Sequence, residues 1–295
     1  GFRGVDIPKE KLADVLRFAF LGSSTTYDAA APEGKEWPAQ TIYRIKARAG
    51  NCKIDFINAG LPGFSTPNME TYWRKVVRQY KPDVVIALPG DMTPNLQKAA
   101  KLEGFQHQDT NKSWLARNSV LWALISKNVA VVRLQHSAFS DKGKFQPNES
   151  ALTKKFRMDL GGLIDSVVED GVFLAVPTIA SHVRRDMPVQ NQLIAADSAL
   201  YHLPFISIPT LIKMQDVYND ALRAVVKHRP GVLLIDGDEL IPADNQHFVD
   251  SRHFAPRGSA VMGKRIADAL LSSAAFQAYV RQRVACNWPD DNEPK

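Results

Sequence analysis

The 295-residue sequence contains only two cysteines, Cys52 and Cys286. Two cysteines exclude a disulfide framework and a cysteine-based zinc cluster, and they leave open a single long-range bridge. No apolar run approaches the ~20 residues that a membrane-spanning helix needs. The first residues, GFRGVDIPKEKLAD, lack the apolar segment of a signal peptide. These absences leave a globular chain of ordinary composition, with 45% hydrophobic and 23% charged residues.

The sequence also lacks a block of consecutive basic residues, although its net charge is +6 and its isoelectric point is about 9.2. Lysine and arginine are spread along the whole chain, and no nucleic-acid-binding motif is present. We therefore expect no nucleic-acid partner.

Five short apolar runs alternate with amphipathic stretches. The runs are continuous, as expected for parallel strands that are buried on both faces. They are 17–22, 53–58, 83–88, 171–176 and 231–236, and the helical stretches are 37–50, 68–83, 151–171, 217–231 and 259–284. This alternation predicts one α/β domain over residues 1–295, a three-layer α/β/α sandwich with a five-stranded parallel sheet in the flavodoxin-like order 2-1-3-4-5.

Residues 94–150 interrupt the alternation. A segment of this length predicts either a lid over a binding site or peripheral helices. Its aromatic residues Phe105, Trp114 and Trp122 could line a binding surface. We favour core positions for them, because aromatic side chains are more often buried than used for binding.

The first apolar run ends in Gly-Ser-Ser-Thr-Thr, residues 22–26. Ser24, Thr25 or Thr26 could cap a following helix. Alternatively, Ser24 could be a nucleophile, because open α/β sheets bind their ligands at the carboxyl ends of the strands.

A candidate base lies near the other end of the chain. Asp250 and His253 are separated by two residues. The carboxylate could fix the tautomer of the imidazole, which would then accept the proton of a serine hydroxyl. A metal site formed by His247, Asp250 and His253 is the alternative, but no accompanying metal motif such as HExxH is present. We expect neither a metal nor an organic cofactor.

Two glycine-containing loops, 58–66 and 80–95, follow the second and third strands. Glycines allow tight turns that direct backbone N–H groups into a pocket. Together with the Ser24 and Asp250–His253 segments, these loops would meet at one edge of the sheet.

These segments resemble the SGNH, or GDSL-like, hydrolase family. Gly22-Ser23-Ser24-Thr25-Thr26 resembles the Gly-Asp-Ser-x-Thr block, with Ser23 where Asp is usual. The strings WPAQ (37–40) and NAGLPG (58–63) resemble its following segments, and DSRH (250–253) matches its Asp-x-x-His block. The resemblance spans residues 17–272 in order. It implies that Ser24, His253 and Asp250 form a catalytic triad and that Gly63 donates a backbone N–H to the oxyanion.

The third block departs from the family pattern. The family has Gly-x-Asn-Asp after the third strand, and its asparagine donates to the oxyanion, whereas Met92 stands at that position here. A thioether cannot donate a hydrogen bond, and losing one oxyanion donor typically costs ~10²–10³ in turnover. Thr93 and Asn95 are the candidate replacements.

The resemblance implies a serine hydrolase that cleaves a small-acyl or carbohydrate O-acetyl ester. The alternatives are an O-acetyltransferase on the same scaffold, and a catalytically weakened member that binds glycans or a protein partner. The missing initial methionine and the habit of the family favour the cell envelope, the periplasm or secretion. The oligomeric state is left open.

Overall fold

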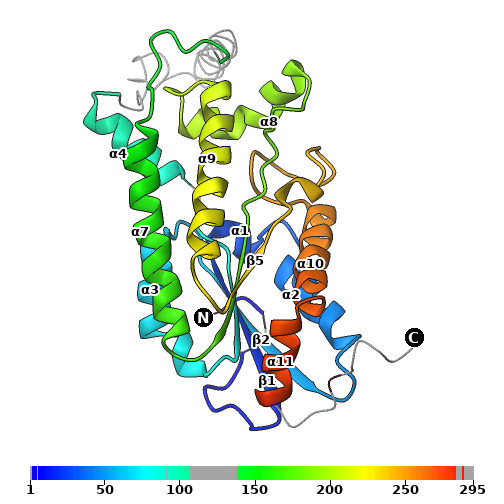
Figure 1. Cartoon of the computed structure of the whole chain (residues 1–295). Helices are drawn as coiled ribbons and strands as arrows, with labels where there is room; N and C mark the ends of the chain where they lie inside the picture. Colours follow the sequence, from blue (N-terminus) through cyan, green and yellow to red (C-terminus); the bar gives the residue numbers. More distant parts are fainter. Residues whose placement is uncertain (1, 5, 91, 106–137, 284–287, 289–295) are drawn as a thin grey trace, which may run out of the picture.

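The computed structural model describes residues 2–4, 6–90, 92–105, 138–283 and 288. Its centre is a five-stranded sheet, drawn in Figure 1. The strands are β1 (Val15–Gly22), β2 (Lys53–Gly60), β3 (Val84–Ala87), β4 (Phe173–Pro177) and β5 (Val232–Ile235). All neighbouring pairs are parallel, and the order is β2-β1-β3-β4-β5. The predicted strand order and direction are confirmed.

Both faces of the sheet are covered, which explains why its strands are continuous apolar runs. In the interior strand β1, Phe18 and Phe20 pack into one core cluster, whereas Ala19 and Leu21 pack into the other. Successive side chains of a strand point to opposite faces, so one apolar run supplies both cores.

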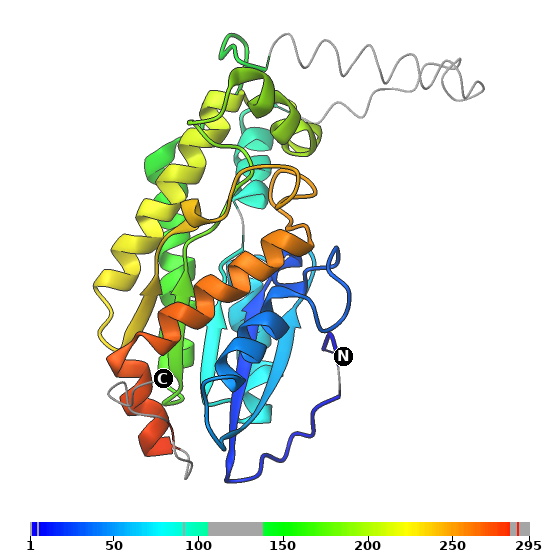
Figure 2. The same cartoon turned by 90° about the vertical axis from the view of Figure 1, so that its right-hand side faces the viewer.

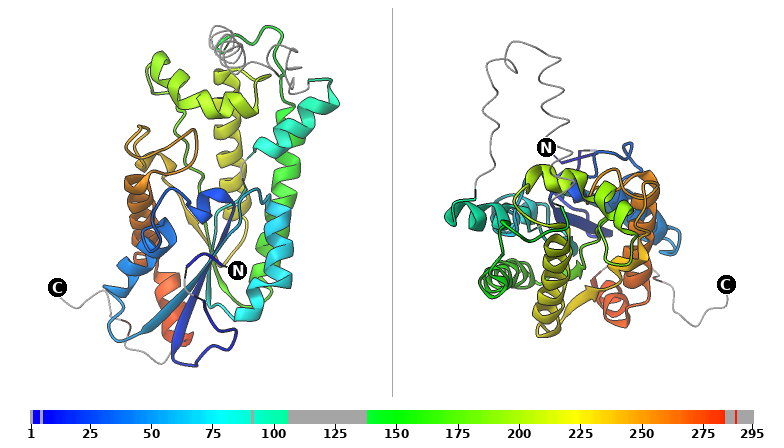
Figure 3. Two further views of the ribbon diagram at one scale, coloured as in Figure 1. Left: turned by 180° about the vertical axis from the view of Figure 1, so that it is seen from behind. Right: turned by 90° about the horizontal axis from the view of Figure 1, so that it is seen from above.

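One face is covered by α3 (Thr66–Lys75), α7 (Glu149–Val168) and α9 (Ile208–Lys227). Phe156 of α7 and Tyr218 of α9 stack with their ring centroids 4.6 Å apart. These helices run together on one side of the sheet in Figure 1, and the view from behind in Figure 3 shows the same grouping.

The other face is covered by α2 (Trp37–Lys46), α10 (Pro256–Leu271) and α11 (Ala274–Arg283). Figure 2 shows α10, in orange, crossing the sheet beside α2. The two helices approach closely because α10 carries Gly263: a Cβ there would lie 2.5 Å from Cβ of Gln40 and 3.1 Å from the carbonyl oxygen of Trp37.

Several element boundaries differ from the predicted ones. The single terminal helix predicted over 259–284 is wrong, because α10 ends at Leu271 and α11 begins at Ala274. Two helices had no predicted counterpart, α4 (Thr93–Leu102) and α8 (Val189–His202). The remaining short helices are α1 (Ser24–Tyr27), η1 (Val77–Tyr80) and η2 (Asp238–Leu240).

The 94–150 segment begins as α4 and leads into α7. Phe105 packs against the core, and its ring centroid lies 5.7 Å from that of Phe145, in line with a core position. Trp114, Trp122 and Cys286 lie outside the described residues. Among the helices that the structure describes, none combines the length and apolarity required to cross a membrane.

Candidate active site

Ser24 lies just beyond the carboxyl end of β1, as the first residue of α1. Its Oγ is 2.8 Å from Nε2 of His253, 229 residues further along the chain. Helix capping does not explain this serine, because Ser23 holds the N-cap position and makes no side-chain capping bond. The structure therefore brings together the two residues that the sequence singled out as nucleophile and base.

Asp250 lies on the other side of the imidazole. Its Oδ2 is 2.6 Å from Nδ1 of His253, and its Oδ1 accepts hydrogen bonds of 2.9 Å from the backbone N–H groups of Arg252 and His253. Burial by itself would raise the pKa of Asp250, but the hydrogen bonds from the His253 ring and from the two N–H groups outweigh it and bring the pKa to about 2. An ionised Asp250 that accepts from Nδ1–H leaves Nε2 as the acceptor for the Ser24 hydroxyl.

The loop that carries Asp250 is anchored by His182, which is only 4% exposed. Its Nδ1 lies 3.1 Å from the carbonyl oxygen of Asp250, and its backbone N–H donates to the carbonyl oxygen of Ser251 at 3.0 Å. The His182 ring stacks on Phe248, with centroids 5.3 Å apart and planes 4° from parallel. Burial lowers the pKa of His182, which favours a neutral ring that donates from Nδ1.

The turn after Ser24 is held by Arg3. Its guanidinium donates to the carbonyl oxygens of Tyr27 and Asp28, both at 2.5 Å, and of Ala31 at 2.6 Å. These bonds satisfy carbonyl groups around the end of α1 that have no partner within the helix. A residue at the start of the chain therefore fixes the short helix that begins with Ser24.

Asp28 connects this turn to two helices of the adjacent layer, α2 and α10. Its Oδ2 accepts from the backbone N–H of Trp37 at 2.9 Å and from the hydroxyl of Ser259 at 2.6 Å. Asp28 is 3% exposed, and this burial raises its pKa from 3.8 to about 6, against the opposing effects of the two hydrogen bonds and of the Arg3 charge.

Two glycines allow the loops around Ser24 to pack closely. A Cβ at Gly60 would lie 2.2 Å from the backbone nitrogen of Tyr27, and one at Gly90 would lie 2.9 Å from the carbonyl oxygen of Phe64. Only glycine permits such approaches. The first, second and third loops therefore meet at one sheet edge, as the sequence predicted.

Of the candidate oxyanion-hole residues on the third loop and α4, Met92 and Thr93 line the pocket, whereas Asn95 points away from it. Gly63 has a φ of +82°, and a Cβ there would meet no atom within 4 Å. Thr93 and Met92 line a pocket beside Ser24, and Met92 is 6% exposed. Asn95 instead donates to the hydroxyl of Tyr218 at 3.3 Å. Thr93 and Asn95 belong to α4 rather than to a loop, and Asn95 is directed to α9.

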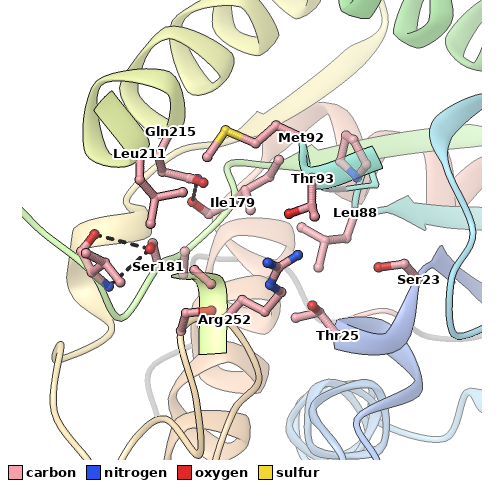
Figure 4. Close-up of a pocket in the computed structure, with 15 residues that line it drawn as sticks. Ser23, Thr25, Leu88, Met92, Thr93, Ile179, Ser181, Leu211, Gln215 and Arg252 are labelled. Atoms are coloured by element: carbon pink, nitrogen blue, oxygen red, sulfur yellow. Dashed lines mark hydrogen bonds between the residues drawn. The ribbon is translucent and has the colours of Figure 1, made fainter. Parts of the chain in front are cut away.

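The pocket is formed by the loops that follow β1, β3 and β4, by α8 and α9, and by the Asp250–His253 loop. Figure 4 shows Ser23, Thr25 and Thr93 on one side and Leu211 and Gln215 on the other. The apolar wall of the pocket is supplied by Leu88, Ile179 and Val183. The pocket therefore combines apolar walls with hydroxyl groups next to Ser24.

Nothing in the described part of the chain forms a cluster of three metal-ligating side chains. His247, which the sequence offered as a ligand, places Nδ1 2.7 Å from Oδ1 of Asp244. The metal alternative therefore has no support in the described residues.

No family model matches the sequence, and no curated protein matches it. Solved structures do match. A lipase from a goat rumen metagenome matches with a TM-score of 0.52 and 12% identity, over 86% of this chain and 97% of the lipase. An acetylxylan esterase from Geobacillus stearothermophilus matches with a TM-score of 0.52 and 12% identity, over 86% of this chain and 93% of the esterase. A family 3 carbohydrate esterase from Clostridium thermocellum matches with a TM-score of 0.50 and 13% identity, over 91% of this chain and 99% of that protein. The chain shares the α/β/α fold of these hydrolases, which is the fold that its resemblance to the SGNH family predicted. Likeness at this identity concerns the fold, so the activity has to be argued from the site.

Three residues that support this site were not predicted from the sequence: Arg3, Asp28 and His182. The hydrogen-bond partners of these three residues lie at least 24 positions away in the sequence, except Trp37, which bonds Asp28. None belongs to a motif with fixed spacing. The one available signal was the position of Asp28 two residues after Thr26, at the end of the first block.

Proposed function

We propose that the protein is a serine esterase that works through an acyl-enzyme. The observation that carries the proposal is the hydrogen-bonded chain from Ser24 through His253 to Asp250, next to a pocket at the carboxyl end of the sheet. A serine hydroxyl becomes a useful nucleophile when an adjacent base accepts its proton.

The reaction has two halves. Ser24 Oγ attacks the ester carbonyl while Nε2 of His253 takes the hydroxyl proton, and the tetrahedral intermediate collapses by expelling the alcohol, which receives that proton. Water then gives a proton to His253 and attacks the acyl-enzyme, and the carboxylic acid leaves as the proton returns to Ser24. Asp250, with its pKa of about 2, stays ionised throughout and stabilises the imidazolium.

The backbone N–H groups of Ser24 and Gly63 are the proposed oxyanion donors. In the described part of the chain, neither N–H donates a hydrogen bond. The positive φ of Gly63 supports this role, because it turns the backbone at a point with open space around it. Thr93, which lines the pocket, is the proposed third donor in place of the family asparagine.

We propose a small-acyl or carbohydrate O-acetyl ester as the substrate. Two of the matching structures carry the names acetylxylan esterase and carbohydrate esterase, which favours this class. An O-acetyltransferase would use the same residues and pass the acyl group to a sugar hydroxyl instead of water. Met92, a buried thioether at the asparagine position, favours a second candidate: a weakened enzyme that binds glycans.

The esterase proposal is tested by the pre-steady-state hydrolysis of p-nitrophenyl acetate. We expect a burst of p-nitrophenol that corresponds to one acyl group per protein, and no burst from Ser24→Ala. Ser23→Ala is the matched control, because it alters the neighbouring hydroxyl and keeps the nucleophile. Loss of the burst in Ser23→Ala and its survival in Ser24→Ala would overturn the assignment.

Hydrolysis and transfer are separated by adding a saccharide acceptor to the same reaction. An esterase releases acetate at the same rate with and without the acceptor, whereas a transferase forms acetylated sugar at the expense of acetate. A protein that binds the saccharide and shows neither reaction would support the weakened-enzyme candidate.

A further inference from the structure

Gln215 of α9 lines the pocket beside Ser24 with an amide that is only half paired. Its Nε2 donates to the backbone carbonyl oxygen of Ile179 at 2.9 Å. Within the part of the chain that the structure describes, its Oε1 accepts no hydrogen bond. Figure 4 shows Gln215 on the opposite side of the pocket from Ser23 and Thr25. The wall of the pocket therefore contains an amide oxygen that is open to a donor.

The orientation of this amide is fixed by the loop that follows β4. Asn219, one turn further along α9, also binds Ile179: its Nδ2 donates to the carbonyl oxygen at 3.0 Å, and its Oδ1 accepts from the N–H at 2.9 Å. Turning the Gln215 amide over would bring its oxygen against the carbonyl oxygen of Ile179, and two acceptors cannot share a hydrogen bond. Gln215 is therefore held with Nε2 on the loop and Oε1 as the unpaired acceptor.

The size and the walls of the pocket limit which donor this oxygen accepts. The cavity measures about 40 Å³, which is room for about three water-sized groups. Leu88, Ile179 and Leu211 line it with aliphatic side chains, so the donor has to arrive on a short and otherwise apolar arm. A charged ammonium against such walls pays a large desolvation cost, whereas a neutral hydroxyl needs only one partner. The pocket therefore fits a short arm of the substrate that ends in a hydroxyl group.

We propose that the ester substrate carries a hydroxyl group on a short arm next to the scissile bond, and that Oε1 of Gln215 accepts its hydrogen bond. A substrate with a methyl group in that place would cover Oε1 without pairing it. A polar group that is buried without a partner loses its bonds to water and gains nothing, so the site would discriminate against the methyl analogue. This inference rests on the proposed esterase function and narrows its substrate to hydroxylated esters.

The experiment compares each hydroxylated ester with the ester in which a methyl group of similar size replaces the hydroxyl. One pair, 2-hydroxyethyl acetate and propyl acetate, places the hydroxyl on the alcohol side. The other pair, ethyl 3-hydroxypropanoate and ethyl butanoate, places it on the acyl side. For each pair, the quantity measured is the ratio of kcat/KM for the hydroxylated ester to kcat/KM for its methyl analogue.

Gln215→Met keeps the length of the side chain and removes the amide, while the two bonds from Asn219 still hold Ile179. In at least one pair, the ratio should be higher in the parent than in this variant by about fivefold or more, which is the scale of one hydrogen bond. Comparing ratios cancels the intrinsic reactivity of the esters and any general loss of activity.

Gln192→Met is the matched control. The Gln192 amide also donates to backbone carbonyl groups of a neighbouring loop, but this residue is not among those that line the pocket. The control variant should keep the ratio of the parent. A change of less than fivefold in both pairs for Gln215→Met, or the same change in Gln192→Met, would overturn the proposal.

Binding separates this proposal from the esterase function. In Ser24→Ala, titration followed by ligand NMR measures the affinity for the four intact esters without turnover. A ratio of affinities that favours the hydroxylated ester more in Ser24→Ala than in Ser24→Ala/Gln215→Met would support the hydroxyl site even if no ester were hydrolysed. The same ratio in both proteins, for both pairs, would refute the site even if Ser24 proved to be the nucleophile.

Discussion

Replacing Asp28 with asparagine should change how the stability of the protein depends on pH. The Asp28 carboxyl lies behind the turn that follows Ser24, where Trp37 and Ser259 donate to its Oδ2. Burial raises its pKa from 3.8 to about 6. Between these two values the folded protein binds more protons at this site than the unfolded chain does, so the carboxyl makes the protein less stable as the pH rises.

The size of the effect follows from the pKa. One pKa unit corresponds to ~1.4 kcal/mol, so the rise from 3.8 to about 6 costs about 3 kcal/mol once Asp28 is fully ionised, above about pH 7. Asparagine does not titrate, and its amide oxygen can accept the same two hydrogen bonds. The free energy of unfolding of Asp28→Asn, minus that of the parent, should therefore rise by about 2.4 kcal/mol between pH 4 and pH 7.5, because the remainder of the effect falls below pH 4.

Urea denaturation of both proteins at several pH values measures this difference. Asp14→Asn is the control, because the hydrogen bond and charge of Lys53 lower the pKa of Asp14 at the surface. Its difference from the parent should change mainly below about pH 4, with the opposite sign, and should stay nearly constant from pH 5 to pH 7.5. The reasoning would be refuted if the free energy of unfolding of Asp28→Asn, minus that of the parent, stayed constant or fell from pH 4 to pH 7.5.

Three further predictions concern the site. Asp250→Asn should lower kcat by about 10⁴-fold without unfolding the protein, because an amide that donates to Nδ1 holds the wrong imidazole tautomer. A small loss of kcat in a steady-state assay would contradict this prediction. His182→Phe keeps the stacking on Phe248 and removes the bond to Asp250, so it should cost about 1 kcal/mol in chemical denaturation and lower kcat more than it changes KM. Met92→Asn should raise kcat by about tenfold or more if position 92 lacks the usual oxyanion donor, and a large fall in the same assay would place the loop differently.

The sheet and the Ser24–His253–Asp250 arrangement were predictable because both leave local signals in the sequence. The strands are continuous apolar runs, since each is buried on both faces, and the segments that carry Ser24 and Asp250–His253 have fixed spacings. The helices α4 and α8 gave no such signal. α4 begins in the polar string TPNLQKAAK, and α8 exposes Val189, Ile194 and Tyr201 instead of following a clean apolar stripe.

The supporting residues of the site were not predictable for a different reason. Arg3 and His182 act on backbone carbonyl groups, which any residue provides, so no pair of residue types identifies the contact. The break between α10 and α11 was missed because Ser272 and Ser273 interrupt an otherwise helical pattern without a proline or a glycine. Such contacts and breaks are decided by tertiary packing.

The central claim is that Ser24 is a nucleophile activated by His253, and active-site labelling with a fluorophosphonate tests it most directly. We expect the parent to be labelled once, on the peptide that contains Ser24, and His253→Ala to react far more slowly. Labelling of Ser24→Ala at the rate of the parent would contradict the account.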